Sequence, residues 1–295
     1  MKNLPVLTAI LAATIAFVSP AARAADAPKP LKVLLLTGGC CHDYAKQKDI
    51  LKKGLEARAN VVIDIIWASK MENNPDGTPR LVNDGSTKPA LSIYGNPDYA
   101  KGYDLVIHDE CAADINDPAV IDGVLKPHQD GIPAVNLHCA MHSYRFGNYN
   151  KPLPMGAENA HWYEYLGLHT IRHGAQKPIE ITFVDTASPI TKGMENWTTI
   201  NEELYNNVNV YPDAHPLARG KQDAGDKPGE NDTVVIWTHE YGPKKTRVFS
   251  TTIGHQNATV EDAKYLDLVT RGVLWATNHI NPDGTAAKGY GPGGK

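Results

Sequence analysis

The chain has 295 residues, of which 42% are hydrophobic and 21% charged. This balance is ordinary for a globular protein and excludes a fibrous or disordered chain. The formal net charge of −4, without a cluster of basic residues, argues against binding to nucleic acid or to anionic lipid.

The N-terminus has the features of a secretory signal. Lys2 precedes an almost wholly apolar run over residues 4–18, and Ala22-Arg23-Ala24 follows as a cleavage pattern. The alternative is a membrane anchor, but this apolar run of roughly 15 residues is shorter than the about 20 that a spanning helix needs. We therefore predict that residues 1–24 are a cleaved signal peptide. The mature protein would be periplasmic or secreted, with no stable membrane insertion.

The next part of the chain alternates apolar runs with helical patterns. Strands are expected at 31–37, 61–67, 104–108 and 133–138, and helices at 45–59 and 117–129. Near-continuous apolar runs of this length are typical of strands buried on both faces of a parallel sheet. The pattern predicts an α/β fold with a doubly wound, mostly parallel sheet and helices on both faces.

Residues 71–102 interrupt this pattern, because they are rich in Asn, Pro, Gly and Asp. We expect a largely irregular surface insertion that lies beside the site.

The C-terminal part contains further strands and one long helix. Strands are expected at 179–184, 234–238 and 247–253, with a turn at Tyr241-Gly242-Pro243, and a helix at 261–278. No repeat or linker divides the chain. We predict one domain over residues 25–285, followed by a flexible tail at 286–295.

Polar side chains follow several of the expected strands. In open α/β sheets, ligands bind outside the carboxyl ends of the strands. The residues at these ends are His42, Asp43, Tyr44, His108, Asp109, His138, His142 and His255. One histidine after a strand is most often a hydrogen-bonded turn residue, but several on one sheet edge predict a shared cleft.

The four cysteines are Cys40, Cys41, Cys111 and Cys139. Three of them come just after expected strands, so they could cluster in space. An oxidising compartment permits disulfides, but the sequence does not choose a pairing, and small buried thiols are the alternative.

Several motifs resemble those of the trehalose-utilisation (ThuA-like) family, in the expected order and over most of the mature chain. They are Thr37-Gly38-Gly39 with His42-Asp43-Tyr44, the segment 131–138, Ser188-Pro189-Ile190-Thr191-Lys192-Gly193 with Glu202-Glu203-Leu204-Tyr205, Gly254-His255, and Arg271-Gly272-Val273-Leu274-Trp275-Ala276. Ser188 stands where the family usually has His, and Glu202 where it usually has Asp. The resemblance implies the fold of the class I glutamine amidotransferases.

The related amidotransferases place a nucleophilic Cys directly after the central strand. Here His138 occupies that position and Cys139 comes one residue later. Because alternate side chains of a strand face opposite ways, we do not interpret Cys139 as a nucleophile.

The resemblance implies carbohydrate processing, by acid–base chemistry on a sugar or keto-sugar derivative. A hydrolase, a lyase or an isomerase would all fit. We assign His255, His138 and Glu203 as catalytic residues. The substrate-binding candidates are His42, Asp43, Tyr44, His108, Asp109, His142, Trp162 and His173.

Two other functions remain open from the sequence. One is a metal-dependent hydrolase, since two or three His with a carboxylate suffice to bind a divalent metal. The other is a sugar-binding protein without turnover. Trp162 could stack on a sugar or simply fill the core. No nucleotide cofactor is expected, and a homo-oligomer is compatible with the sequence.

Overall fold

The computed structural model describes residues 28–223 and 232–294 of the chain. The predicted signal peptide lies outside the described residues. The strands are β1 Leu31–Gly39, β2 Val61–Asn73, β3 Pro79–Asn83, β4 Leu105–Cys111, β5 Ala134–Leu137, β6 Leu168–Phe183, β7 Trp197–Val210, β8 His215–Gln222, β9 Asp232–Tyr241 and β10 Thr246–Thr251. The α-helices are α1 Tyr44–Glu56, α2 Pro118–Gln129, α3 His161–Leu166, α4 Asn257–Glu261 and α5 Ala263–Ala276, and two 3₁₀ turns are η1 His138–His142 and η2 Pro292–Gly294.

The strands form one sheet in the order β3-β2-β1-β4-β5-β10-β9-β8-β6-β7. The pairs within β2-β1-β4-β5-β10 are parallel, whereas β3 and the β9-β8-β6-β7 portion pair antiparallel. The prediction of an α/β sheet is therefore confirmed, but four of the nine neighbouring pairs are parallel, so "mostly parallel" does not describe it. The antiparallel portion arises because hairpins, and not helical crossovers, join the later strands.

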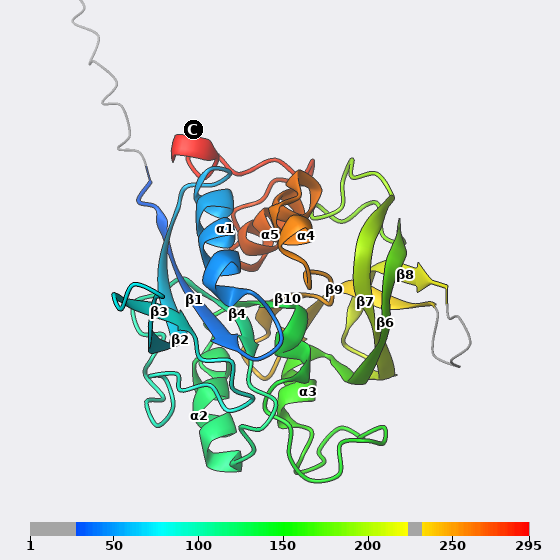
Figure 1. Ribbon diagram of the computed structural model, residues 1–295. Coiled ribbons are helices and arrows are strands. Elements are labelled where there is room, and N and C mark those ends of the chain that lie inside the picture. Colours follow the sequence, from blue (N-terminus) through cyan, green and yellow to red (C-terminus); the bar gives the residue numbers. More distant parts are fainter. Residues whose placement is uncertain (1–27, 224–231, 295) are drawn as a thin grey trace, which may run out of the picture.

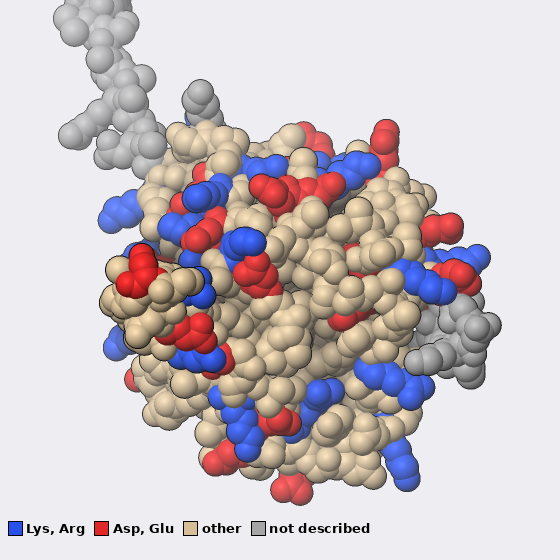
Figure 2. Space-filling view, viewed as in Figure 1, with Lys and Arg blue, Asp and Glu red and all other residues tan. Residues whose placement is uncertain are grey.

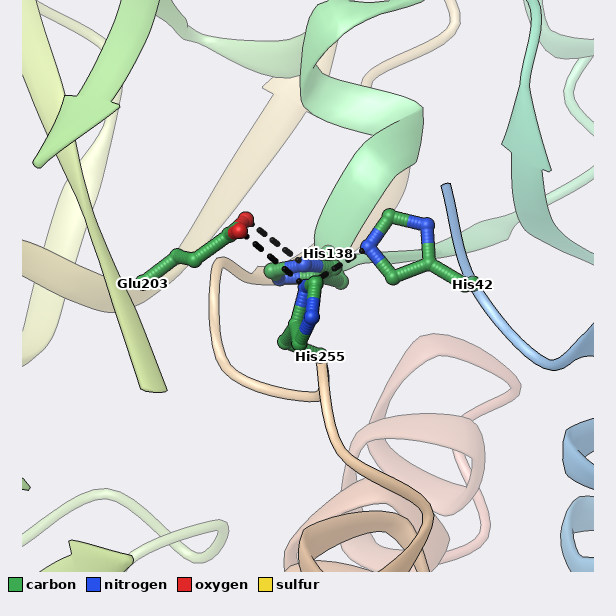
Figure 3. A group of neighbouring side chains, drawn as sticks. All are labelled: His42, His138, Glu203 and His255. Atoms are coloured by element: carbon green, nitrogen blue, oxygen red, sulfur yellow. Dashed lines mark hydrogen bonds and ion pairs between the residues drawn. The ribbon is translucent and has the colours of Figure 1, made fainter. Parts of the chain in front are cut away.

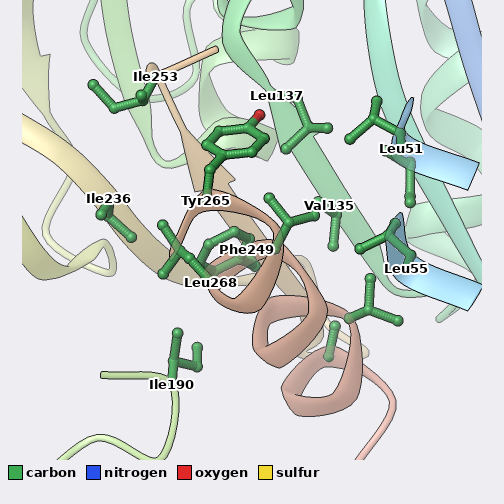
Figure 4. Close-up of a cluster of buried hydrophobic side chains, with 14 of the residues drawn as sticks. Leu51, Leu55, Val135, Leu137, Ile190, Ile236, Phe249, Ile253, Tyr265 and Leu268 are labelled. Carbon is green, nitrogen blue, oxygen red and sulfur yellow. The ribbon is translucent and has the colours of Figure 1, made fainter. Parts of the chain in front are cut away.

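Helices cover both faces of the parallel portion, with α1 and α5 on one side and α2 and α3 on the other (Figure 1). Side chains alternate along β1, so that Val33 and Leu35 join one core cluster and Leu34 and Leu36 join the other. Figure 4 shows the first cluster, where Phe249 of β10 packs between β5 and α5.

The insertion at 71–102 is only partly irregular. Its first part continues β2 and returns as β3, which pairs antiparallel with β2 between Ser69 and Asn83. Its second part carries Leu91, Ile93 and Tyr99 into the core cluster that also contains α2. The insertion thus closes one edge of the sheet and thickens one layer, and it contributes no side chain to the histidine cluster described below.

The C-terminal tail packs on the domain, in contrast to the expected flexible segment. The Tyr290 carbonyl accepts a hydrogen bond from the Asn60 backbone N–H at 3.0 Å. The Tyr290 ring lies 3.7 Å from that of His279, measured between ring centroids. These contacts anchor residues 286–294 beside the start of β2.

Acidic and basic side chains are intermixed on the face shown in Figure 2. Among the described residues, no helix combines the length and the apolar character needed to cross a bilayer.

Two helical glycines provide a matched test of core packing. A Cβ at Gly272 of α5 would lie 2.5 Å from a ring carbon of Phe249, whereas a Cβ at Gly123 of α2 would meet nothing within 4 Å. We expect Gly272→Ala to lower the free energy of unfolding by about 1–3 kcal/mol through overpacking. Gly123→Ala should be neutral or stabilising by up to about 1 kcal/mol. Urea unfolding of both variants checks this, and equal effects would contradict the packing argument.

Candidate functional site

Four side chains from distant parts of the sequence converge at the carboxyl edge of the sheet (Figure 3). His42 follows β1, His138 follows β5, His255 follows β10, and Glu203 comes from β7. The His42 ring centroid lies 4.7 Å from that of His138 and 4.7 Å from that of His255. The parallel topology thus brings together the three histidines that the sequence places after strands.

The polar atoms of this cluster are spaced like the ligands of a metal ion. One ligand atom from each of the four residues lies within 4.8 Å of all the others. His42 Nε2 is 3.0 Å from His255 Nδ1, and Glu203 lies 3.2 Å from His255 Nδ1 and 3.4 Å from His138 Nε2. Tetrahedral ligands at about 2.0–2.1 Å from a zinc ion stand about 3.3 Å apart.

Hydrogen bonds behind the cluster set the tautomer of His138. Its Nδ1 lies 2.7 Å from the Thr252 carbonyl oxygen, which can only accept, so Nδ1 carries a proton. In the neutral ring, Nε2 therefore presents a lone pair toward Glu203. His138 itself has a φ of 40°, a left-handed conformation that is uncommon outside glycine and is often found at functional sites.

His42 is held in a similar way. The Tyr44 hydroxyl lies 3.0 Å from His42 Nδ1 and can accept its proton, which leaves the Nε2 lone pair facing the cluster. Burial, followed by the nearby His138 and His255, lowers the pKa of His42 to about 2. The ring is therefore neutral at physiological pH.

Glu203 is the anionic member of the cluster. Burial acts to raise its pKa, but the polar contacts with His138 and His255 outweigh burial, and the pKa lies well below its usual range. The same contact with Glu203 raises the pKa of His255.

Glu202, the neighbour of Glu203 in the chain, holds the His255 loop in place. Its buried carboxylate accepts backbone hydrogen bonds from Gly254, His255 and Gln256, the shortest being 2.9 Å from the His255 N–H. Two successive residues of β7 therefore have different roles. Glu202 fixes the loop, and Glu203 faces the histidines. The sequence analysis noted Glu202 only as an acidic residue of the family motif. No local sequence pattern indicates that it holds the His255 loop.

The open side of the cluster is polar. The Gln176 side-chain amide lies 2.9 Å from His255 Nε2 and also bonds to Gln256. His173, whose side chain is 41% exposed, places Nδ1 3.6 Å from Glu203. Donors and acceptors on this rim suit a ligand with several hydroxyl groups.

The comparisons with known proteins address the family. The family model described as "ThuA: Trehalose utilisation" matches residues 86–276, which is more than half of the chain. The chain belongs to the ThuA family. The matched span includes His138, Glu203 and His255, whereas His42 precedes it.

A solved structure of a putative ThuA-like protein from Parabacteroides merdae supports the same fold. It is 19% identical, covers 88% of this chain and 97% of its own, and superposes with a TM-score of 0.59. A putative GMP synthase protein from Thermoplasma acidophilum (10% identical; 81% and 94% covered; TM-score 0.40) and a glutamine amidotransferase from Thermotoga maritima (11%; 85% and 86%; 0.39) match more weakly. No curated protein matches the sequence.

Several predicted substrate-binding residues of this ThuA protein lie in the core. His108 is fully buried and contacts Glu110 and His128, because β4 continues three residues beyond it to Cys111. Trp162 is 1% exposed and donates its indole N–H to the Ala140 carbonyl. The interpretation of both as cleft residues was wrong.

Other predicted residues stand behind or beside the cluster. Asp109 accepts a hydrogen bond from the Thr37 hydroxyl, and burial raises its pKa well above the usual value. His142 stacks on the ring of Tyr205 at 4.1 Å between centroids. Asp43 accepts from Asn257 at the start of α1. These residues support the walls of the site, whereas His173 reaches its rim.

Proposed function

We propose that this ThuA protein binds a divalent metal through His42, His138, His255 and Glu203 and uses the site to process a sugar or keto-sugar derivative. One observation supports the metal: His138 Nε2 and a Glu203 oxygen face each other at 3.4 Å, and in the neutral ring, whose Nδ1 proton is bound to Thr252, Nε2 has a lone pair. Two acceptors at that distance need a proton or a cation between them. The Tyr205 hydroxyl, also 3.4 Å from Nε2, is too distant for a strong hydrogen bond.

The donor set fits a transition metal of intermediate softness, such as Zn²⁺. Imidazole and carboxylate are its usual ligands beside thiolate. Both His42 and His138 have their second ring nitrogen bonded to an oxygen, as is typical of metal-bound histidines. When bound, the metal would polarise a carbonyl or hydroxyl oxygen of the substrate.

The remaining groups of the site would then handle the substrate. His173, Gln176 and Gln256 offer hydrogen bonds at the open rim. The Gln176 amide fixes the orientation of the His255 ring, and Glu202 fixes its loop. The carbohydrate class is supported by the family description and by this polar rim, and acid–base chemistry by the histidines.

Turnover separates an enzyme from a binding protein. We expect purified protein supplied with Zn²⁺ to cleave or isomerise a 3-keto-glycoside, and His255→Ala to lower kcat/KM by at least about 100-fold, because it removes a group at the reacting centre. His161→Ala serves as the control, since that exposed ring pairs only with Asp122 in the described structure. Thermal stabilisation by the sugar without turnover would instead favour a binding protein.

We also propose that the protein is exported. Cleavage after Ala24 predicts a mature chain that begins near Ala25 or Asp26 and is found in the periplasm or medium. The intact mass of the protein purified from its native host checks this. Soluble protein that retains Met1 would contradict it.

A further inference from the structure

All four cysteines of the chain meet beside the histidine cluster. Cys40 and Cys41 follow β1, Cys111 ends β4 and Cys139 lies in η1, so neighbouring strands bring them together. Cys40 is bonded to Cys41, and Cys111 to Cys139. The Cys40 sulfur lies only 3.6 Å from the Cys111 sulfur, which links the two disulfides end to end.

The two disulfides differ in their access to solvent. Cys41 is exposed and Cys40 is partly exposed, whereas Cys111 and Cys139 are only 4% and 6% exposed. Thiol–disulfide exchange requires a thiolate to reach a sulfur atom, so a reductant in solution can attack the first pair but not the second. The contact between Cys40 and Cys111 is the route from one to the other.

We propose that Cys40 and Cys41 form a dithiol relay that passes reducing equivalents from an external dithiol to the buried Cys111–Cys139 disulfide. The relay goes beyond the proposed sugar chemistry and does not depend on it.

The steps balance with one dithiol as the co-reactant. One thiolate of that dithiol attacks Cys41, forms a mixed disulfide and releases the Cys40 thiolate. The second thiolate of the dithiol then resolves the mixed disulfide, so the reductant leaves oxidised and Cys40 and Cys41 are both reduced. These steps move two electrons from the dithiol to the chain.

Two internal exchanges follow, without further electron input. The Cys40 thiolate attacks Cys111, forms a Cys40–Cys111 bond and releases the Cys139 thiolate. The Cys41 thiolate then attacks Cys40, restores the Cys40–Cys41 disulfide and releases the Cys111 thiolate. The net products are one oxidised dithiol and two reduced cysteines, Cys111 and Cys139, whose sulfur atoms lie within 4.8 Å of a His42 ring nitrogen.

A pair of single variants tests the central contact without any reductant. In Cys41→Ser, the free Cys40 thiol is left against Cys111, so we expect a Cys40–Cys111 disulfide and free Cys139 in at least about a tenth of the chains. In the matched variant Cys40→Ser, we expect Cys41 to be the free thiol and Cys111–Cys139 to persist. Each sample is acid-quenched, unfolded, alkylated and mapped without reduction after cleavage before aspartates, since Asp130 separates Cys111 from Cys139.

The native chain provides a second test that does not depend on the folding of either single variant. With dithiothreitol under native conditions, Cys111 and Cys139 should become reduced at least about tenfold faster than in the double variant Cys40→Ser/Cys41→Ser. In denaturant the two proteins should react alike, since burial no longer limits access. Equal native rates, or a Cys41→Ser protein in which Cys40 alone is alkylated, would overturn the relay.

Discussion

Replacing His138 by Ala is expected to lower the affinity for Zn²⁺ by at least about 100-fold, or about 2.7 kcal/mol. The variant loses the ligand whose tautomer is fixed by the Thr252 carbonyl. It also removes the His138 nitrogen that lies 3.4 Å from a Glu203 oxygen. Calorimetric titration of Zn²⁺ into chelator-treated protein checks this, with one ion expected per chain.

The pH dependence of this binding has a definite sign. The raised pKa of His255 means that its proton must be displaced on metal binding, so affinity should fall as pH decreases. His161→Ala is the control and should titrate like the native chain. No binding to the native chain, or equal affinities for His138→Ala and His161→Ala, would contradict the metal site.

Replacing His108 by Ala is expected to lower the free energy of unfolding by about 3–5 kcal/mol. His108 Nδ1 lies 2.7 Å from a Glu110 oxygen, and both side chains are fully buried. Without the histidine, the buried Glu110 carboxyl group keeps only the Tyr144 hydroxyl among its described side-chain partners, and breaking a buried polar pair by removing one partner is costly. For a chain of this size, the melting temperature should fall by at least about 6 °C.

The same variant separates a core histidine from a site histidine. Zn²⁺ affinity of the folded His108→Ala protein should match that of the native chain, because His108 is not a member of the four-residue cluster. A variant that is as stable as the native chain but has lost metal binding would show instead that His108 belongs to the site.

The parallel half of the fold could be predicted because its strands are apolar on both faces. The apolar run at 31–37 is one such signal and corresponds to β1. In the antiparallel portion, the turn at Tyr241-Gly242-Pro243 is a local signal that corresponds to the β9–β10 hairpin. The strand β7, Trp197–Val210, was missed. Its many polar Asn and Glu residues interrupt the alternation of apolar and polar residues that is typical of a strand. Its conformation depends instead on pairing with β6.

The site was predictable to the extent that topology determines it. His42, His138 and His255 each follow a strand of the parallel portion, so a common edge places them together. The same reasoning wrongly placed His108 at this edge, because the sequence pattern ends its strand three residues before the end of β4 in the structure. Glu203 was predicted as a site residue only from the family motif. The contact of Gln176 with His255 joins residues that are 79 positions apart, and no local pattern reveals it.

The position of β7 has a consequence for folding. It is the last strand in the sheet order, yet Glu203 and Glu202 bond to residues that follow β10, near the middle of the sheet. The long β6–β7 ribbon, with its four register shifts, must therefore bend back before the site exists. Contacts of such large sequence separation close slowly. Acquisition of metal affinity during refolding should consequently be among the last events, later than the formation of the β1–β2 pairing.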